Sequence, residues 1–159
     1  MKAAIIGTRD LKNREGVIRN IFSYVLKNNL DIDFIVSGNA EGTDQIANYF
    51  AQKHICVLHY LPWNSYNKHL RQDQNPNIRY TTNVITKFDK HIIQLFPHMK
   101  NQKESVWNLI RRNYQIILGE YGDNPVDIVF YHVNTEEVSG GTRYGVLLAE
   151  QYNIKTVRV

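Results

Sequence analysis

Short apolar runs alternate along the chain with longer segments in which apolar residues recur every three or four positions. The runs cover residues 2–6, 32–36, 55–60, 126–131 and 154–159, and the first three are followed by glycine, serine–glycine and leucine–proline. A short apolar run bounded by turn residues is typical of a buried strand. The sequence therefore predicts five strands.

The segments between these runs predict helices, because their apolar residues return to one face at helical spacing. The expected helices cover residues 17–26, 43–54, 103–118 and 141–152, and residues 78–93 carry a weaker helical pattern.

Strands that alternate with helices favour a parallel sheet that is covered on both faces. We expect an α/β fold, a Rossmann-like three-layer α/β/α arrangement with a mostly parallel five-stranded sheet in the order 3-2-1-4-5, numbered along the chain. Residues 1–159 are expected to form a single domain, with an insertion at about residues 64–102. The polar residues 64–77 at its start predict a loop, and Tyr66 within it is expected at the surface.

Three glycine-containing loops are expected to converge at one edge of this sheet. In open parallel sheets, ligands bind at the carboxyl ends of the strands where the strand order reverses, here between the first and fourth strands. The loops cover residues 7–10, 37–44 and 139–142. Glycine lets the backbone approach a ligand closely, and the helix after each loop offers unpaired N–H groups to an anion. The expected ligand-binding residues in these loops are Gly7, Thr8, Arg9, Ser37, Gly38, Asn39, Gly42, Thr43, Gly140, Gly141 and Thr142.

Each loop also has a simpler interpretation, because a strand-to-helix turn often contains glycine only to turn the chain. Thr43 and Thr142 suit either a phosphate or the capping of their own helices, while Arg9 suits a bidentate phosphate contact. None of the loops matches the G-x-G-x-x-G or the G-x-x-x-x-G-K-[ST] motif. The sequence therefore argues against a conventional dinucleotide-dependent dehydrogenase and a P-loop NTPase.

Two acidic residues and one tryptophan near these loops are further candidates. Asp44 and Glu41 are candidate catalytic carboxylates or acceptors of a ribose hydroxyl, and the alternative for Asp44 is to stabilise the start of its helix. Trp63 either covers the edge of the sheet or stacks on a base.

Three consecutive polar residues, at positions 111–113, lie in the predicted helix of residues 103–118. Asn113 falls between the apolar positions of this helix, where asparagine is unfavourable. Asn113 either satisfies the backbone of a loop or points with Arg112 toward the ligand. Arg111 is expected in solvent.

The overall composition is that of an ordinary globular chain. Of its 159 residues, 43% are hydrophobic and 21% are charged, which argues against a disordered or fibrous protein. The net charge of +4 and the pI of 9.1 permit contact with phosphates, but they are a weak indication of nucleic-acid binding.

The cysteine and histidine content and the length of the apolar runs limit the kinds of site and the cellular location that we expect. The single cysteine, Cys56, excludes an internal disulfide framework and a cysteine-rich zinc site. The six histidines lack the spacing of a metal motif such as H-E-x-x-H, so that no metal and no cofactor are expected. No apolar run approaches the ~18–20 residues that span a bilayer, and residues 1–7 are too short an apolar stretch for a secretion signal. We expect a cytoplasmic protein with no membrane contact.

Taken together, the glycine loops resemble the SLOG superfamily, the Rossmann-like group that contains the DNA-processing protein DprA and the LOG phosphoribohydrolases. The residues that carry the resemblance are Gly7-Thr8-Arg9, Ser37-Gly38-x-Ala40-x-Gly42-x-Asp44-x-x-Ala47 and Gly140-Gly141-Thr142. Within the superfamily, the chain resembles small bacterial and phage proteins through Leu61-Pro62-Trp63-Asn64 and Arg112-Asn113. The resemblance covers most of the chain outside about residues 68–102.

The resemblance implies a pocket for a nucleotide-type ligand and a homodimer. LOG-type hydrolases carry a Gly-Gly-x-Gly-Thr-x-x-Glu motif whose glutamate serves the cleavage of the glycosidic bond. Gly145 occupies the position of that glutamate here, and Glu150 lies about two helical turns beyond Thr142. This departure counts against phosphoribohydrolase activity by that mechanism.

Three functions remain as hypotheses. The expected one is binding of a nucleotide or nucleotide-derived ligand, such as a mononucleotide or an ADP-ribose-like molecule, at the carboxyl edge of the sheet. The first alternative is an enzyme that hydrolyses or transfers N-glycosidic bonds of nucleotides, with Asp44 and Glu41 as its carboxylates. The second is a single-stranded DNA-binding mediator that resembles DprA, favoured by aromatic residues near basic ones such as Tyr66 and Lys68.

Overall fold

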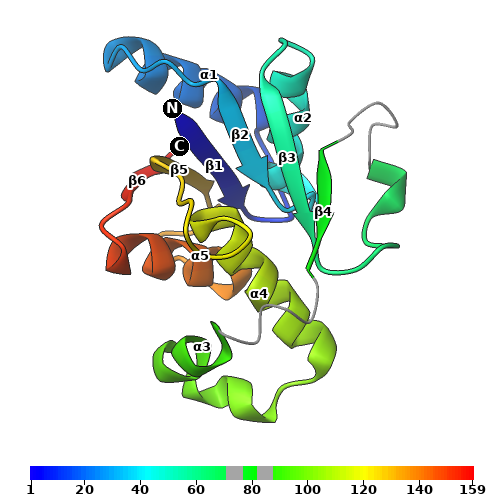
Figure 1. Cartoon of the computed structure of the whole chain (residues 1–159). Coiled ribbons are helices and arrows are strands. Elements are labelled where there is room, and N and C mark those ends of the chain that lie inside the picture. The colour runs from blue at the N-terminus through cyan, green and yellow to red at the C-terminus, as the bar shows by residue number, and fades with distance from the viewer. Residues whose placement is uncertain (71–76, 82–87) are drawn as a thin grey trace.

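The sheet of this protein contains six strands in the residues that the structure, a computed structural model, describes: 1–70, 77–81 and 88–159. The strand order is β4-β3-β2-β1-β5-β6, and every strand pair between them is parallel (Figure 1). The strands are β1 (Lys2–Gly7), β2 (Phe34–Ser37), β3 (Cys56–Leu61), β4 (Ile78–Tyr80), β5 (Ile128–His132) and β6 (Lys155–Arg158).

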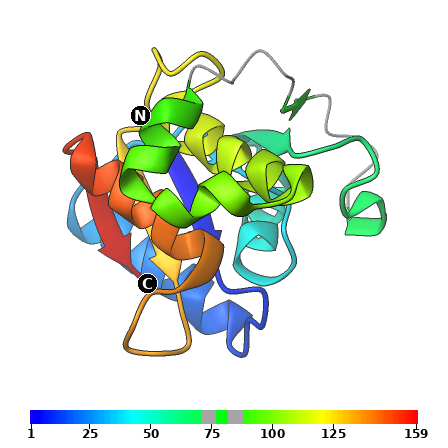
Figure 2. The ribbon, with the colours of Figure 1, turned by 90° about the horizontal axis from the view of Figure 1, so that it is seen from below.

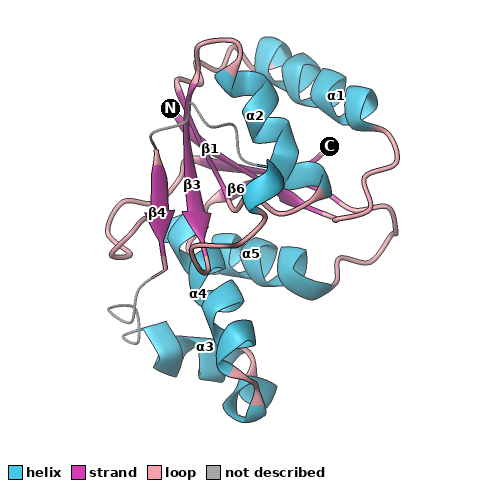
Figure 3. Ribbon diagram, turned by 90° about the vertical axis from the view of Figure 1, so that its right-hand side faces the viewer, coloured by secondary structure: helices cyan, strands magenta, loops and turns pink. Residues whose placement is uncertain are grey.

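Helices cover both faces of this sheet, which makes a parallel α/β fold of three layers (Figure 3). The α-helices are α1 (Arg14–Lys27), α2 (Ile46–Ala51), α3 (Asp89–Leu95), α4 (Glu104–Leu118) and α5 (Gly140–Gln151). Short 3-10 helices are η1 (Gly42–Gln45), η2 (Lys68–Leu70) and η4 (Pro97–Asn101). Helices α1 and α2 lie on one face, and α4 and α5 lie on the other, with α3 beyond α4 (Figure 2).

The side chains of β1 alternate between two apolar cores, as the period of a strand requires. Ala3 and Ile5 are buried with residues of α1 and α2. Ala4 and Ile6 are buried with residues of α4 and α5. This burial on both faces explains why β1 reads as a continuous apolar run.

Helix α4 is the longest helix among the described residues and packs against β2, β3 and α5. Ile110, Tyr114 and Ile117 bury its apolar face, which is the stripe that the sequence predicts. The helix ends at Gly119, whose φ of +85° is a conformation that L-residues rarely adopt.

The five predicted strands and their relative order are confirmed, but the strand count is wrong. The sequence assigned residues 78–80 to a helical pattern, whereas they form β4 and pair with β3 at the edge of the sheet. Three residues are too few to show an alternating pattern. The helix expected over residues 78–93 is helical from Asp89, where α3 begins and continues to Leu95, and residues 82–87 lie outside the described part. So do residues 71–76 of the predicted loop.

Candidate functional site

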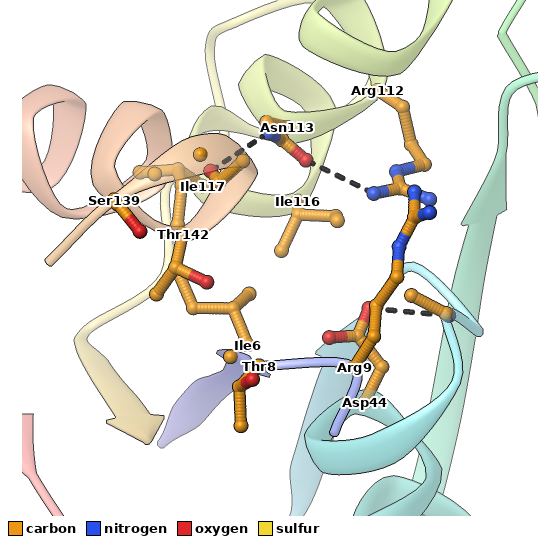
Figure 4. A pocket seen from close by; sticks show the side chains of 15 residues that line it. Ile6, Thr8, Arg9, Asp44, Arg112, Asn113, Ile116, Ile117, Ser139 and Thr142 are labelled. Carbon is orange, nitrogen blue, oxygen red and sulfur yellow. Dashed lines mark hydrogen bonds between the residues drawn. The ribbon is translucent and has the colours of Figure 1, made fainter. Parts of the chain in front are cut away.

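A cavity of about 340 Å³ lies at the carboxyl ends of β1 and β5, where the strand order reverses (Figure 4). Its walls come from four segments that are distant in the sequence. These are residues 6–9 after β1, Ala40 and Asp44 from the segment after β2, one face of α4, and residues 139–145 at the start of α5. Parts of all three predicted loops therefore meet around one concavity.

Gly7 allows the loop after β2 and the end of β5 to pack against the end of β1. A Cβ at Gly7 would lie 2.4 Å from the carbonyl oxygen of His132 and 2.6 Å from Thr43 Oγ1. The N–H of Thr8 donates to His132 O at 2.9 Å, and Thr43 N donates to Thr8 O at 3.0 Å. A side chain at residue 7 would separate these segments.

The first turn of α5 presents backbone N–H groups to the cavity. Ser139, Gly140, Gly141 and Thr142 line it, and the side chain of Ser139, the N-cap residue, makes no capping hydrogen bond. The first N–H groups of a helix have no partner within the helix and carry a partial positive charge. This end of α5 is therefore suited to an anion.

Arg112 brings a buried positive charge to the opposite wall. Its residue is 7% exposed, and its Nη1 and Nη2 donate to Gly38 O at 3.2 Å and to Asn113 Oδ1 at 3.3 Å. Its Nε is buried without a hydrogen-bond partner among the described residues. None of the ion pairs between described residues includes Arg112. An unpaired buried N–H of a cation is unfavourable in a folded protein.

Arg9 adds a second guanidinium at the mouth of the cavity. It is exposed, and Figure 4 shows its side chain extending toward Arg112. Two guanidinium groups that approach one another repel unless an anion lies between them. The pair favours a ligand with concentrated negative charge, because guanidinium binds phosphate through parallel hydrogen bonds.

Asp44 is the buried carboxylate of the cavity. Its Oδ2 accepts from Gly38 N at 3.0 Å and from Ala40 N at 3.4 Å, and the backbone of Gly7 also hydrogen-bonds to the carboxylate. Burial raises the pKa of Asp44, while the charge of Arg112 and these backbone donors oppose the rise. Asp44 therefore holds its proton to a higher pH than an ordinary aspartate.

Asn113 ties α4 to the start of α5. Its Nδ2 donates to Gly141 O at 3.1 Å, and its Oδ1 accepts from Arg112. Asn113 satisfies a backbone carbonyl at the start of α5, which is close to the structural interpretation, and it also lines the cavity. Its contact with a ligand stays a prediction. Ile6, Ile116 and Ile117 supply apolar surface to the wall, and the sequence did not single them out as site residues.

Several expected ligand-binding residues support the loops from outside the cavity wall. Ser37 is fully buried and its Oγ donates to Ile5 O at 2.9 Å, while Thr43 Oγ1 donates to Thr8 O at 3.1 Å. Asn39 Oδ1 accepts from the side chain of Gln45 at 2.9 Å. At Gly42, whose φ is +79°, a Cβ would lie 2.2 Å from Thr8 O.

Glu41 and Trp63 do not lie in the cavity wall. Glu41 is exposed. Trp63 is 38% exposed, and its ring packs edge-on against Tyr66 at 5.2 Å. Tyr66 was expected at the surface, but it is buried with its ring 5.3 Å from the guanidinium carbon of Arg112. No pattern in the sequence signals this contact.

Gly145 lies in the second turn of α5 and lines the cavity. A Cβ there would lie 2.6 Å from Ile6 Cδ1, so that glycine lets α5 pack closely against β1. A glutamate at this position would require Ile6 to move.

Residues 1–70, 77–81 and 88–159 contain no group of three or more His, Cys, Asp or Glu side chains placed to hold a metal ion. None of the helices in these segments is long and apolar enough to cross a membrane. Comparisons with protein-family models, with curated proteins and with solved structures found no match.

Proposed function

We propose that the chain binds a nucleotide or nucleotide-derived ligand, such as a mononucleotide or an ADP-ribose-like molecule, in the cavity between β1, α4 and α5. The observation that carries this proposal is the buried Nε of Arg112, which lacks an acceptor among the described residues and belongs to a residue that lines the same cavity as the free N-terminus of α5. Both groups are complementary to a phosphate.

In this proposal, the phosphate lies between the first turn of α5 and the guanidinium groups of Arg9 and Arg112. The apolar wall of Ile116 and Ile117 contacts the sugar or base, and the carboxyl group of Asp44 accepts a hydrogen bond from a ribose hydroxyl. The volume of about 340 Å³ falls within the range of about 300–1,000 Å³ that is typical of small-molecule sites. The resemblance of the three loops to the SLOG superfamily supports the same ligand class.

A thermal-shift and calorimetric series tests the proposal. The ligands are AMP, ADP-ribose and ribose 5-phosphate, with adenosine as the compound that lacks a phosphate. We expect the phosphorylated compounds to raise the melting temperature, because a ligand of the native state stabilises it, and adenosine to have little effect.

The matched variants are Arg112→Gln in the cavity and Arg19→Gln on α1, where the arginine is exposed. Arg112→Gln should weaken binding by about tenfold or more, equivalent to about 1.4 kcal/mol, and Arg19→Gln should not. Stabilisation by none of the phosphorylated compounds at millimolar concentration would contradict the proposal.

A second function, cleavage of an N-glycosidic bond, is favoured by Asp44. Its carboxyl lines the cavity and burial raises its pKa, which suits a general acid. In such a reaction Asp44 protonates the departing base while the C1′–N bond breaks, water supplies the hydroxyl group that C1′ gains, and the remaining proton of the water returns to the Asp44 carboxylate. Chromatography for free base after incubation with nucleotides tests this function. Absence of free base, or undiminished turnover by Asp44→Asn, would contradict it.

A further inference from the structure

A second cavity, of about 590 Å³, lies at the amino ends of β1 and β2, on the face of the sheet that α4 covers in part. We name it the amino-edge cavity. Its floor is formed by Phe34 and Val36 of β2 and by Leu58 and Tyr60 of β3, and residues 119–127 form its rim. It is separate from the cavity with Arg112, although Ile116 of α4 contacts both.

Gln115 contributes a polar group to this otherwise apolar wall. The residue is fully buried and lines the amino-edge cavity. Its Oε1 accepts from Thr81 Oγ1 at 2.8 Å, whereas its Nε2 is buried without a partner among the described residues. A buried amide with one end unpaired is uncommon in folded proteins and points to a missing partner.

The orientation of the Gln115 amide does not change this conclusion. The hydroxyl of Thr81 is both a donor and an acceptor, so that it can pair with either end of the amide. In each orientation the other end of the amide is left without a partner among the described residues. A neutral group that both donates and accepts, such as a carboxamide, complements Gln115 in either case.

The charges at the rim select against an anion. Glu120, Asp123 and Asp127 line the cavity. The ammonium group of Lys2 also lines it, but it donates to Asn124 O at 2.6 Å and to Asn124 Oδ1 at 2.7 Å. Three carboxylates against one engaged cation make the rim acidic, and this disfavours a negatively charged ligand by like-charge repulsion.

We propose that the amino-edge cavity binds a small, uncharged, mainly apolar molecule with a carboxamide-type group, which pairs with the free end of the Gln115 amide while its apolar part packs on Phe34, Leu58 and Tyr60. The volume of the cavity is within the range of ligand sites. The site does not depend on the nucleotide proposal, because its ligand class and its lining charges are different.

Two probes with one ring system test the charge and the polar group together. These are 2-naphthamide, which is neutral, and 2-naphthoate, which is an anion of similar size. In an NMR titration of the isotope-labelled wild-type protein, 2-naphthamide should shift the side-chain amide resonances of Gln115 and the backbone resonances of Leu58 and Gly119. The affinity for 2-naphthoate should be weaker by about tenfold or more. No shift with 2-naphthamide at its solubility limit, or equal binding of both probes, would overturn the proposal.

Variants separate the role of Gln115 from simple apolar binding. Gln115→Met keeps the length of the side chain and removes the amide, and should weaken 2-naphthamide binding by about tenfold. Gln151→Met, at an exposed position of α5, is the matched control and should bind as the wild type does.

The double variant Glu120→Gln, Asp123→Asn leaves Gln115 in place and should admit 2-naphthoate, which gives a test that does not require Gln115→Met to fold. Unchanged 2-naphthamide binding by a folded Gln115→Met, or continued exclusion of 2-naphthoate by the double variant, would count against the proposal.

Discussion

Arg112 of α4 donates from Nη1 to the carbonyl oxygen of Gly38, which lies 74 positions earlier in the chain, at a distance of 3.2 Å. The N–H of the same glycine donates to Asp44 Oδ2 at 3.0 Å. The backbone of Gly38 thus bridges the buried cation and the buried carboxylate. The position of the Arg112 guanidinium in the cavity depends on this bridge and on the absence of a side chain at residue 38.

Gly38→Ala should disturb the bridge. A Cβ at residue 38 would lie 2.9 Å from Arg112 Cζ, from Arg112 Nε and from Asp44 Oδ2, which is closer than real Cβ contacts allow. We expect the free energy of unfolding to fall by about 1–3 kcal/mol, as for other overpacked sites, and AMP binding to weaken because Arg112 is displaced. Urea denaturation and calorimetry measure the two effects.

Gly141→Ala is the control for this prediction. Its Cβ would meet Asn113 Nδ2 at 3.7 Å, an ordinary contact, and alanine is favourable within a helix. The stability of this variant should not fall. If Gly38→Ala is as stable as the wild type, the bridge tolerates a side chain and the steric explanation is wrong.

Asp44→Asn tests how burial affects the carboxyl group. Because burial raises the pKa of Asp44 in the folded state above the ordinary value of 3.8, the folded protein binds a proton more readily than the unfolded chain. The stability of the wild type relative to Asp44→Asn should be greatest below pH 3.8 and should fall as the pH rises through the folded-state pKa. Urea titrations of both proteins from acidic to neutral pH measure this difference.

Asp33→Asn is the control, because the contribution of Asp33 to stability should change with pH in the opposite direction. The pKa of the exposed Asp33 is lowered by its hydrogen bond to the N-terminal ammonium group, so that its contribution to stability is present above pH 3.8 and is lost as the pH falls through the folded-state pKa. If the stability of the wild type relative to Asp44→Asn instead grows with pH, then Arg112 and the backbone donors outweigh the effect of burial on the carboxylate.

The elements that follow from a repeating pattern of apolar residues could be predicted from the sequence, whereas the features that depend on single tertiary contacts could not. The apolar runs give β1, β2, β3 and β5, most of whose residues are buried between the two helical layers. The run at residues 154–159 gives β6, an edge strand whose first and last residues are exposed. The meeting of the glycine loops follows from the strand order, since the carboxyl ends of parallel strands share one edge.

Single tertiary contacts leave no such pattern. Tyr66 is buried because its ring packs on Arg112, which is 46 positions away. Arg111 was expected in solvent, and this expectation is wrong, because the residue is 7% exposed and pairs with Asp89 of α3. A periodic pattern identifies neither the Tyr66–Arg112 contact nor the Arg111–Asp89 pair. Each joins two segments that are separated by loops, and the length of a loop follows no period.

The ion pair between α3 and α4 should contribute to stability. Arg111 Nε and Nη2 donate to Asp89 Oδ1 at 2.9 Å and Oδ2 at 2.7 Å, a bidentate geometry that favours strong pairing. Asp89→Asn breaks this geometry and leaves Arg111 buried without its main counter-charge. We expect a loss of about 1–3 kcal/mol in urea denaturation, less than for a fully buried pair, because the Asp89 side chain is 24% exposed.

Glu104→Gln is the comparison for this pair. Glu104 also contacts Arg111, at 2.6 Å, but its side chain is 66% exposed, and exposed pairs contribute about 0–1 kcal/mol. Equal losses for the two variants, or no loss for Asp89→Asn, would show that the bidentate pair does not hold α3 to α4.

Tyr66 should act on the ligand through Arg112. Its buried ring lies 5.3 Å from the guanidinium carbon, and a desolvated cation–π contact of this kind is worth about 1–2 kcal/mol. Tyr66→Leu removes the aromatic face and lets the guanidinium move, so AMP affinity should fall by about threefold to tenfold. Tyr66→Phe keeps the ring face and should bind AMP within about twofold of the wild type. If the leucine and phenylalanine variants lose the same affinity, the hydroxyl group rather than the ring of Tyr66 positions Arg112.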